Sequence, residues 1–160
     1  MNGPLLIGLA VILSLGGYLL ITASPSGSQG NTSAFSAQIV AFAQAILQAE
    51  NSGTVDPATN NPGNLIVTSA TNSILQQGWT RKYASSGVSI YDNTADGWNA
   101  LYNQLQLIVN GQSALANPAN GDTISDLAYG WTTTNPDGWA ETVAGQLGVI
   151  PDTPLSQVLS

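Results

Sequence analysis

Residues 35–65 read FSAQIVAFAQAILQAENSGTVDPATNNPGNL, which predicts a helix followed by a turn rich in Asn, Pro and Gly. In the first half, apolar residues recur at intervals of four, three and four, the spacing of one helical face. They are Phe35, Ile39, Phe42 and Ile46. One further step of four leads to Glu50. We therefore expect a helix, capped near its start by Thr32 or Ser33, that places this carboxyl group on its core-facing side.

Glu50 has an unfavourable position for a charged side chain. Burial disfavours the ionised form, and the C-terminal end of a helix has the negative end of the macrodipole. Both effects raise the pKa of a carboxyl group, which suits a general acid near neutral pH. A partly exposed glutamate at a frayed helix end is the alternative interpretation. Glu50 is one of two glutamates in the chain, and we take it as the candidate catalytic residue.

The run Asn60-Asn61-Pro62-Gly63-Asn64 has the composition of a rigid turn. Pro fixes φ, Gly permits positive φ, and Asn side chains bond to nearby backbone groups. One interpretation is an ordinary turn that leads into a short strand at residues 65–67. The other is a wall of amide donors and acceptors, opposite the carboxyl group, that binds sugar hydroxyl and N-acetyl groups.

An ordered series of short motifs resembles the lysozyme-like, lytic-transglycosylase-related domains of bacteriophage virion proteins. The series spans residues 35–156 and begins with Ala49-Glu50-Asn51-Ser52-Gly53 and the Asn-rich turn. It continues with Ser89-Ile90-Tyr91, Gly97-Trp98-Asn99-Ala100-Leu101, Asp122-Thr123-Ile124, Leu147-Gly148-Val149 and Asp152-Thr153-Pro154-Leu155. Two positions depart from the family pattern: Asn51 stands where Gly is expected, and Trp139 stands where Tyr is common.

The resemblance implies an α+β fold that is mostly helical and lysozyme-like, with a small antiparallel β-element near residues 64–91. It also implies cleavage of peptidoglycan strands with Glu50 as general acid and base. The residues that we expect to contact the glycan are Ser52, Asn60, Asn61, Asn64, Tyr91, Tyr129 and Trp131. For Tyr129 and Trp131 there is also a chemical reason, because aromatic rings stack on the C–H faces of sugars.

The number of carboxyl groups separates two mechanisms. Glycoside hydrolysis uses two of them, one on each side of the scissile bond. The candidate partners of Glu50 are Asp56 and Asp92, and Glu141 is a weak alternative to Glu50 itself. Lytic transglycosylases, as the resemblance implies, act with one Glu. It protonates the glycosidic oxygen and then deprotonates the muramic acid 6-hydroxyl, which closes a 1,6-anhydro ring. We favour this non-hydrolytic route.

The N-terminal part of the chain differs in composition from the rest. Residues 4–23 contain no charged side chain and are long enough to cross a bilayer core. We expect a transmembrane helix within residues 1–23, a flexible polar linker at 24–33 and a globular domain at 34–160. A cleaved signal peptide is the alternative, but its n-region would lack Lys and Arg. The expected substrate places the C-terminal domain outside the cytoplasm.

Patterns beyond the turn predict the remaining elements. Short strands are expected at residues 66–67 and 88–91, with the basic segment 79–83 as a loop between them. Helices are expected from Thr94 to Asn110, from Thr123 to Leu127 and from Pro136 to Gly148, with a terminal turn after Thr153. Trp98 and Trp139 have the spacing of core residues.

Composition excludes several functions. Two cationic residues against nine acidic ones, a formal charge of −7, argue against nucleic acid as a partner. The chain has no His and no Cys, which excludes the usual zinc sites, disulfides and Cys or His nucleophiles. The aspartates also lack the spacing of a calcium-binding EF-hand loop. We therefore expect no metal and no cofactor.

The leading hypothesis is a membrane-anchored, peptidoglycan-cleaving enzyme of a bacteriophage virion that opens the cell wall during genome entry. The expected location is the virion membrane or the host inner membrane. The expected partners are peptidoglycan strands, the lipid membrane through residues 4–23, and other virion membrane or capsid proteins. Two alternatives remain: a non-catalytic structural or glycan-binding virion membrane protein of the same fold, and a bacterial periplasmic enzyme held in the inner membrane.

Overall fold

The structure, a computed structural model, describes residues 35–67, 73–76, 78–83 and 87–160. Its α-helices are α1 (Ala37–Asn51), α2 (Thr94–Val109), α3 (Ile124–Trp131), α4 (Pro136–Leu147) and α5 (Leu155–Val158). The other elements are the 3₁₀ helices η2 (Ser73–Gln76) and η3 (Pro118–Asn120) and the strands β1 (Trp79–Tyr83) and β2 (Ser89–Tyr91). The expected mostly helical architecture with a small antiparallel β-element is confirmed for this part of the chain.

The transmembrane helix expected within residues 1–23 and the linker expected at 24–33 lie outside the described residues. None of the helices in the described ranges has the length and apolar character needed to span a membrane.

Helix α1 forms where the apolar spacing predicts it, with a different cap. The side chain of Ser36, and not Thr32 or Ser33, accepts a hydrogen bond from the N–H of Ile39 and starts the helix at Ala37. The helix ends at Ser52, which adopts the left-handed conformation. The buried face comprises Ile39, Phe42, Ala43, Ala45, Ile46 and Leu47. This face places α1 in the centre of the molecule.

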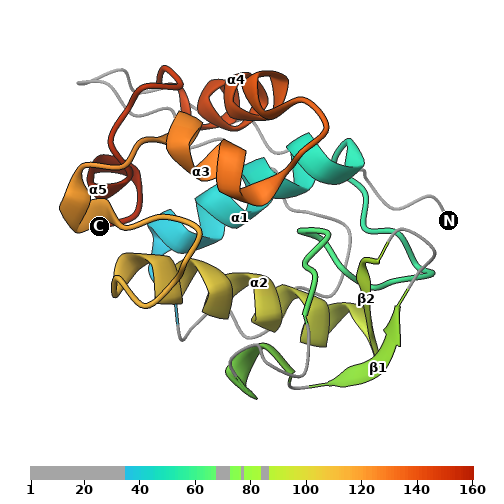
Figure 1. Ribbon diagram of the computed structural model, residues 1–160. Coiled ribbons are helices and arrows are strands. Elements are labelled where there is room, and N and C mark those ends of the chain that lie inside the picture. The colour runs from blue at the N-terminus through green and yellow to red at the C-terminus, as the bar shows by residue number, and fades with distance from the viewer. Residues whose placement is uncertain (1–34, 68–72, 77, 84–86) are drawn as a thin grey trace, which may run out of the picture.

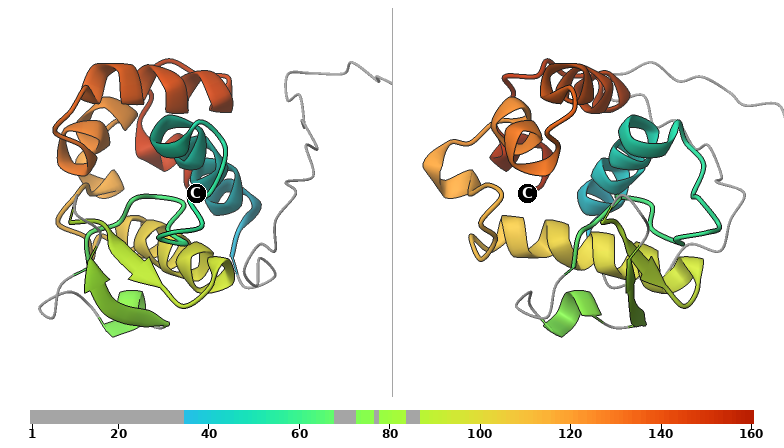
Figure 2. Two further views of the ribbon diagram at one scale, coloured as in Figure 1. Left: turned by 90° about the vertical axis from the view of Figure 1, so that its right-hand side faces the viewer. Right: turned by 45° about the vertical axis from the view of Figure 1, so that its right-hand side comes forward.

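The helices form layers around α1. It packs against α4 on one side and α2 on the other, and α3 packs against α4 (Figure 1). Figure 2 shows the same order from two further directions, with β1 and β2 at one end of α2. Phe35, just before α1, packs against Tyr102 of α2 with ring centroids 5.1 Å apart. The core between these layers is fully buried, with Leu101 and Leu105 from α2, Leu127 from α3 and Val143 from α4.

The β-element differs in detail from the expectation. Strands β1 and β2 pair antiparallel, with Trp79 opposite Tyr91 and an irregular register between the strands. The segment 79–83, expected as a loop, is therefore a strand, and residues 66–67, expected as a strand, are not in one. Instead, Leu65 accepts one backbone bond from Ser89, and the Ser89 hydroxyl group accepts a bond from the N–H of Val67. The Ser89 side chain therefore replaces a second backbone-to-backbone hydrogen bond between the two segments.

Local capping rules predict the remaining helices well. Thr123 caps α3 in a capping box with Asp126, and α4 begins at Pro136 and ends at Gly148, which has a φ of 71°. Helix α3 continues to Trp131, beyond the expected end at Leu127. Gly97, in the first turn of α2, is required because a Cβ atom there would overlap the carbonyl oxygen of Asn60. The Asn-rich turn therefore lies directly on α2.

Candidate active site

Glu50 lies in the last turn of α1, where its half-buried side chain lines a cavity of about 360 Å³. The cavity lies between the end of α1, the loop after α3 and the first turns of α4. Its other lining residues are Ala49, Thr132, Thr134, Asn135, Gly138, Trp139 and Thr142. Most of them offer hydroxyl, amide or indole groups. The carboxyl group therefore faces a neutral, hydrogen-bonding surface.

Each carboxylate oxygen of Glu50 accepts a hydrogen bond from a neutral side chain. The indole Nε1–H of Trp139 donates to Oε1 over 2.8 Å. The amide Nδ2–H of Asn64 donates to Oε2 over 2.9 Å. One donor belongs to α4 and the other to the Asn-rich turn, so two segments that are distant in sequence fix the orientation of the carboxyl group.

The pKa of Glu50 is raised above its ordinary value because burial disfavours the charged form. The hydrogen bonds from Asn64 and Trp139 have smaller, opposite effects, since both stabilise the carboxylate. In the described part of the chain, no neighbouring charge contributes to the shift. Burial thus moves the group towards the protonation state that a general acid needs.

The Asn-rich turn places Asn64 beside Glu50. Asn61 organises the turn from within: its Nδ2 donates to the carbonyl oxygens of Leu65 and Ser89, and its Oδ1 accepts from the N–H of Leu65. Asn64 has a φ of 48°, in the left-handed region that Asn tolerates better than most residues. Asn51 links the turn to α1 by donating to the carbonyl oxygen of Pro62 over 3.0 Å. The amide of Asn64 is therefore held by a rigid segment.

Two tryptophans connect the turn to α3 and α4. The rings of Trp131 and Trp139 lie with centroids 5.8 Å apart at a tilt of 32°. The indole N–H of Trp131 donates to the carbonyl oxygen of Gly63 over 3.2 Å. A Cβ atom on Gly63 would lie 3.4 Å from the Trp131 ring and 2.8 Å from Leu101, so only glycine fits comfortably there. These contacts connect the Trp139 donor to the Asn64 donor through one packed unit.

Asn64 and Trp131 also line a second cavity, of about 500 Å³. Its walls are partly apolar, from Leu65, Ile66, Val67, Leu75, Leu107, Ala114 and Leu115, and partly polar, from Gln104, Gln112 and Ser113. Asn64 therefore contacts the carboxyl group of the first cavity and forms part of the wall of the second.

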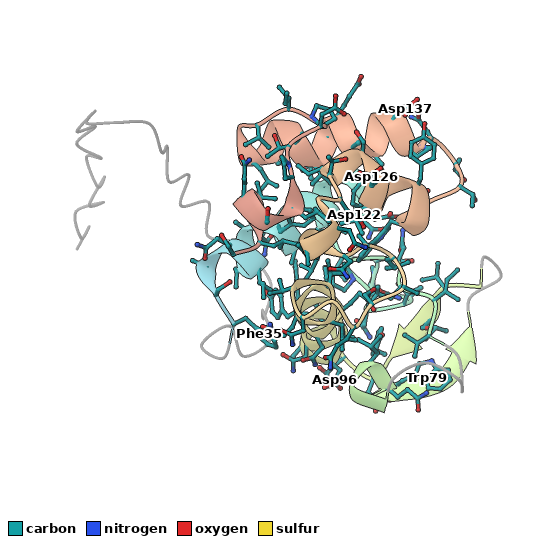
Figure 3. All side chains as sticks on the ribbon, turned by 60° about the vertical axis from the view of Figure 1, so that its left-hand side comes forward. Phe35, Trp79, Asp96, Asp122, Asp126 and Asp137 are labelled. Atoms are coloured by element: carbon teal, nitrogen blue, oxygen red, sulfur yellow. The ribbon has the colours of Figure 1, made fainter. Side chains whose placement is uncertain are left out.

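The other candidate carboxyl groups lie elsewhere. Asp56 is exposed and accepts a hydrogen bond from the N–H of Ala58, and Asp92 and Glu141 are exposed. None of the three lines either cavity. Figure 3 shows Asp126 and Asp137 at one end of the molecule and Asp96 beside Trp79 at the other. Among the described residues, no group of three or more His, Cys, Asp or Glu side chains could hold a metal ion.

Of the predicted site residues, the structure brings Glu50, Asn64 and Trp131 together. Ser52 is exposed at the end of α1 and lines neither cavity. The side chain of Asn60 is engaged in bonds within the protein. Its Nδ2 donates to the carbonyl oxygen of Tyr91, and its Oδ1 accepts from the hydroxyl group of Thr94. Both bonds join the turn to β2 and α2.

Three further predicted glycan contacts, Asn61, Tyr91 and Tyr129, line neither cavity. Asn61 is 0% exposed and Tyr91 is 1% exposed, and the Tyr91 hydroxyl group donates to the carbonyl oxygen of Leu75. Both side chains are buried and so are not accessible to a ligand in this structure, and their hydrogen bonds hold the turn and the β-element in place. Tyr129 is 64% exposed, donates to Asp137 and lines neither cavity.

Sequence reasoning missed the contact between Trp139 and Glu50. The helical spacing correctly predicts that Trp139 is buried, and it is 5% exposed. However, a buried indole N–H requires an acceptor. Glu50 is one of only two glutamates, and the apolar spacing places it on a core-facing side. The need of the buried Trp139 indole for an acceptor was therefore the sequence signal that could have paired it with Glu50.

Comparison with protein-family models, with curated proteins and with solved structures finds no match for this chain. The functional argument therefore depends on the site itself.

Proposed function

We propose that this chain is a peptidoglycan lytic transglycosylase with a lysozyme-like domain, and that Glu50 is its general acid and base. The observation that supports this most directly is the environment of Glu50. One half-buried carboxyl group, with a raised pKa, lies between two neutral donors in a cavity that no other described carboxyl group lines. A reaction that needs one carboxyl group fits this arrangement better than hydrolysis, which needs two.

In the proposed reaction, Glu50 begins in its protonated form. It gives its proton to the glycosidic oxygen as the bond between that oxygen and the anomeric carbon breaks, and the bonding electrons remain with the leaving oxygen. The resulting carboxylate then accepts the proton of the muramic acid 6-hydroxyl. That oxygen attacks the anomeric carbon and closes the 1,6-anhydro ring, which restores protonated Glu50 without adding water.

The surfaces around Glu50 suit a neutral glycan. Thr132, Thr134, Asn135 and Thr142 offer hydroxyl and amide groups in the first cavity, and Trp131 lies at the wall of the second. Sugar hydroxyl groups bond to such side chains, and sugar C–H faces pack on indole rings. The setting we propose is a virion membrane or host inner membrane, with residues 4–23 as the anchor and the domain outside the cytoplasm.

Replacement of Glu50 tests the proposal. Glu50→Gln removes the acidic proton while keeping the side-chain shape, and a general acid typically contributes 10²- to 10⁴-fold in rate, so we expect a loss of about that size. Glu141→Gln is the matched control, because Glu141 is exposed and lines neither cavity. Release of soluble muropeptides from purified peptidoglycan is the readout, and circular dichroism checks folding. Full activity of folded Glu50→Gln would contradict the proposal.

One observation favours a second candidate, a glycan-binding module without catalysis. Both oxygens of Glu50 are already bonded to the protein, which also suits a carboxylate that only helps to form the site. This candidate predicts saccharide binding by the wild-type chain with no product released.

A further inference from the structure

The two side chains that donate to Glu50, Trp139 and Asn64, differ in how they can respond when the carboxyl group becomes protonated. A protonated carboxyl group has one hydroxyl donor and one carbonyl acceptor. An indole N–H only donates, whereas the side chain of Asn has a donor and an acceptor that exchange places when the amide rotates by half a turn. Trp139 and Asn64 therefore restrict the two carboxylate oxygens differently.

Trp139 restricts Oε1. Its ring is 5% exposed, packs on Trp131 and belongs to the first turn of α4, so the direction of its N–H is fixed. A proton on Oε1 would change this oxygen from a carbonyl into a hydroxyl group, which is a weaker acceptor for the fixed, buried N–H, so protonation at Oε1 is unfavourable. Oε1 therefore remains an acceptor in both protonation states.

Asn64, in contrast, allows Oε2 to become protonated. Within the described residues, the bond to Oε2 is the only hydrogen bond of the Asn64 side chain. When the amide group of Asn64 rotates by half a turn, no other hydrogen bond to the described residues is broken. The carbonyl oxygen Oδ1 then lies opposite Oε2. Asn61 in the same turn differs, because its Nδ2 and Oδ1 are both engaged by buried backbone groups.

We propose that the transferable proton of Glu50 is carried by Oε2, and that Asn64 is a positioning residue whose amide reverses each time the proton leaves or returns. When Oε2–H is present it donates to Oδ1 of Asn64. When the proton passes to an acceptor oxygen of the ligand, the electron pair stays on Oε2 and Nδ2 of Asn64 turns back to stabilise it. The proton is therefore delivered from the carboxyl oxygen that faces Asn64.

Other titratable groups on the neighbouring elements do not interfere with this assignment. On α4, Asp137 accepts the hydroxyl group of Tyr129, and Glu141 is exposed. On α3, Asp126 is engaged in the capping box with Thr123. On the described elements packed around it, Glu50 therefore titrates between two neutral partners.

Nuclear magnetic resonance of the full chain tests the assignment without any substrate. Carboxyl-labelled glutamate gives two signals, one for Glu50 and one for Glu141, and Glu141→Gln identifies them. In ¹⁵N-labelled chain, Trp139→Phe and Asn64→Gly identify the indole and amide signals. On acidification through the Glu50 titration, we expect the Trp139 indole proton to keep its hydrogen-bonded shift. We expect the Asn64 amide protons to move to the shift of an unbonded amide. Loss of the Trp139 bond, or an unchanged Asn64 amide, would overturn the proposal.

Asn64→Gly provides a second test, because glycine also tolerates the positive φ of this position. Loss of a donor to the carboxylate should raise the pH at which the Glu50 signal titrates, whereas Asn120→Ala, at an exposed position, should leave it unchanged. An unchanged titration in folded Asn64→Gly would contradict the role of Asn64. This inference rests on the proposed function only in treating Glu50 as an acid and base. The signals report on the protein alone. The expected spectral changes can therefore be absent although peptidoglycan is cleaved, or present although no peptidoglycan is cleaved.

Discussion

The indole Nε1–H of Trp139 donates a 2.8 Å hydrogen bond to Oε1 of Glu50, across 89 positions of sequence. The bond joins the last turn of α1 to the first turn of α4, the two helices that pack most extensively on each other. One contact therefore satisfies a buried indole, orients a carboxyl group and connects two core helices. The acidity of Glu50 depends on how these helices pack.

Trp139→Phe should raise the pKa of Glu50, because the carboxylate loses a stabilising donor while its burial remains. If Glu50 must be protonated to act, the alkaline limb of the activity profile should move to higher pH. Trp131→Phe is the matched control, since it removes an indole that donates to Gly63 instead of Glu50. Carboxyl-labelled glutamate measures both pKa values. An equal shift in the two variants would show that loss of ring volume, and not the hydrogen bond, is responsible.

The stability of the folded chain should depend on pH through Glu50. Its pKa is raised from 4.5, so the native state holds a proton that the unfolded state releases between the two pKa values. The contribution of Glu50 to stability is therefore fully present below the unfolded pKa and is lost as pH rises through the folded pKa. We expect the Tm of wild type minus the Tm of Glu50→Gln to increase on acidification from pH 8 to pH 5. A difference that is constant with pH would mean that Glu50 is not buried as described.

Asn61→Ala should destabilise the fold strongly. It removes three hydrogen bonds to buried backbone groups, and at about 1 kcal/mol or more for each bond the loss is about 3 kcal/mol. Asn120→Ala, at an exposed position in η3, should change the free energy of unfolding by less than about 0.5 kcal/mol. Denaturant unfolding measures both. If Asn61→Ala were as mild as the control, the turn would not depend on Asn61.

Two glycines on helices should respond in opposite ways to alanine. Gly97→Ala places a Cβ atom on the carbonyl oxygen of Asn60, and we expect a loss of about 2 kcal/mol or more. Gly145→Ala, on α4, meets nothing within 4 Å and should stabilise the chain by up to about 1 kcal/mol, because Ala is the better helix former. Thermal unfolding of the two variants checks this. Equal effects would contradict the described contact between α2 and the turn.

Local rules explain why much of the fold is predictable from sequence. The apolar spacing from Phe35 to Ile46 places Glu50 correctly at a half-buried helix end, because periodicity depends on neighbours only. The cap at Thr123 and the ending at Gly148 follow from the same kind of local chemistry. The strand at 79–83 was missed, since its pairing with β2 depends on a partner several residues away.

The site was less predictable because identical residues have different roles in it. Asn60, Asn61 and Asn64 look alike in sequence, yet Asn61 is fully buried and Asn64 reaches Glu50. Their roles depend on which backbone groups the turn brings to each amide. Trp139 likewise has the spacing of a core residue, and its bond to Glu50 appears only when α4 is packed on α1. Tertiary packing decides such contacts.

The most direct test of the central claim is to incubate the full chain with purified peptidoglycan and determine the masses of the soluble products. We predict anhydromuropeptides, which are lighter than hydrolysed products by one water, and their absence with Glu50→Gln. Hydrated reducing ends would contradict the single-carboxyl mechanism and require a second carboxyl group at the site. Folded wild-type chain that releases no product would contradict catalysis itself.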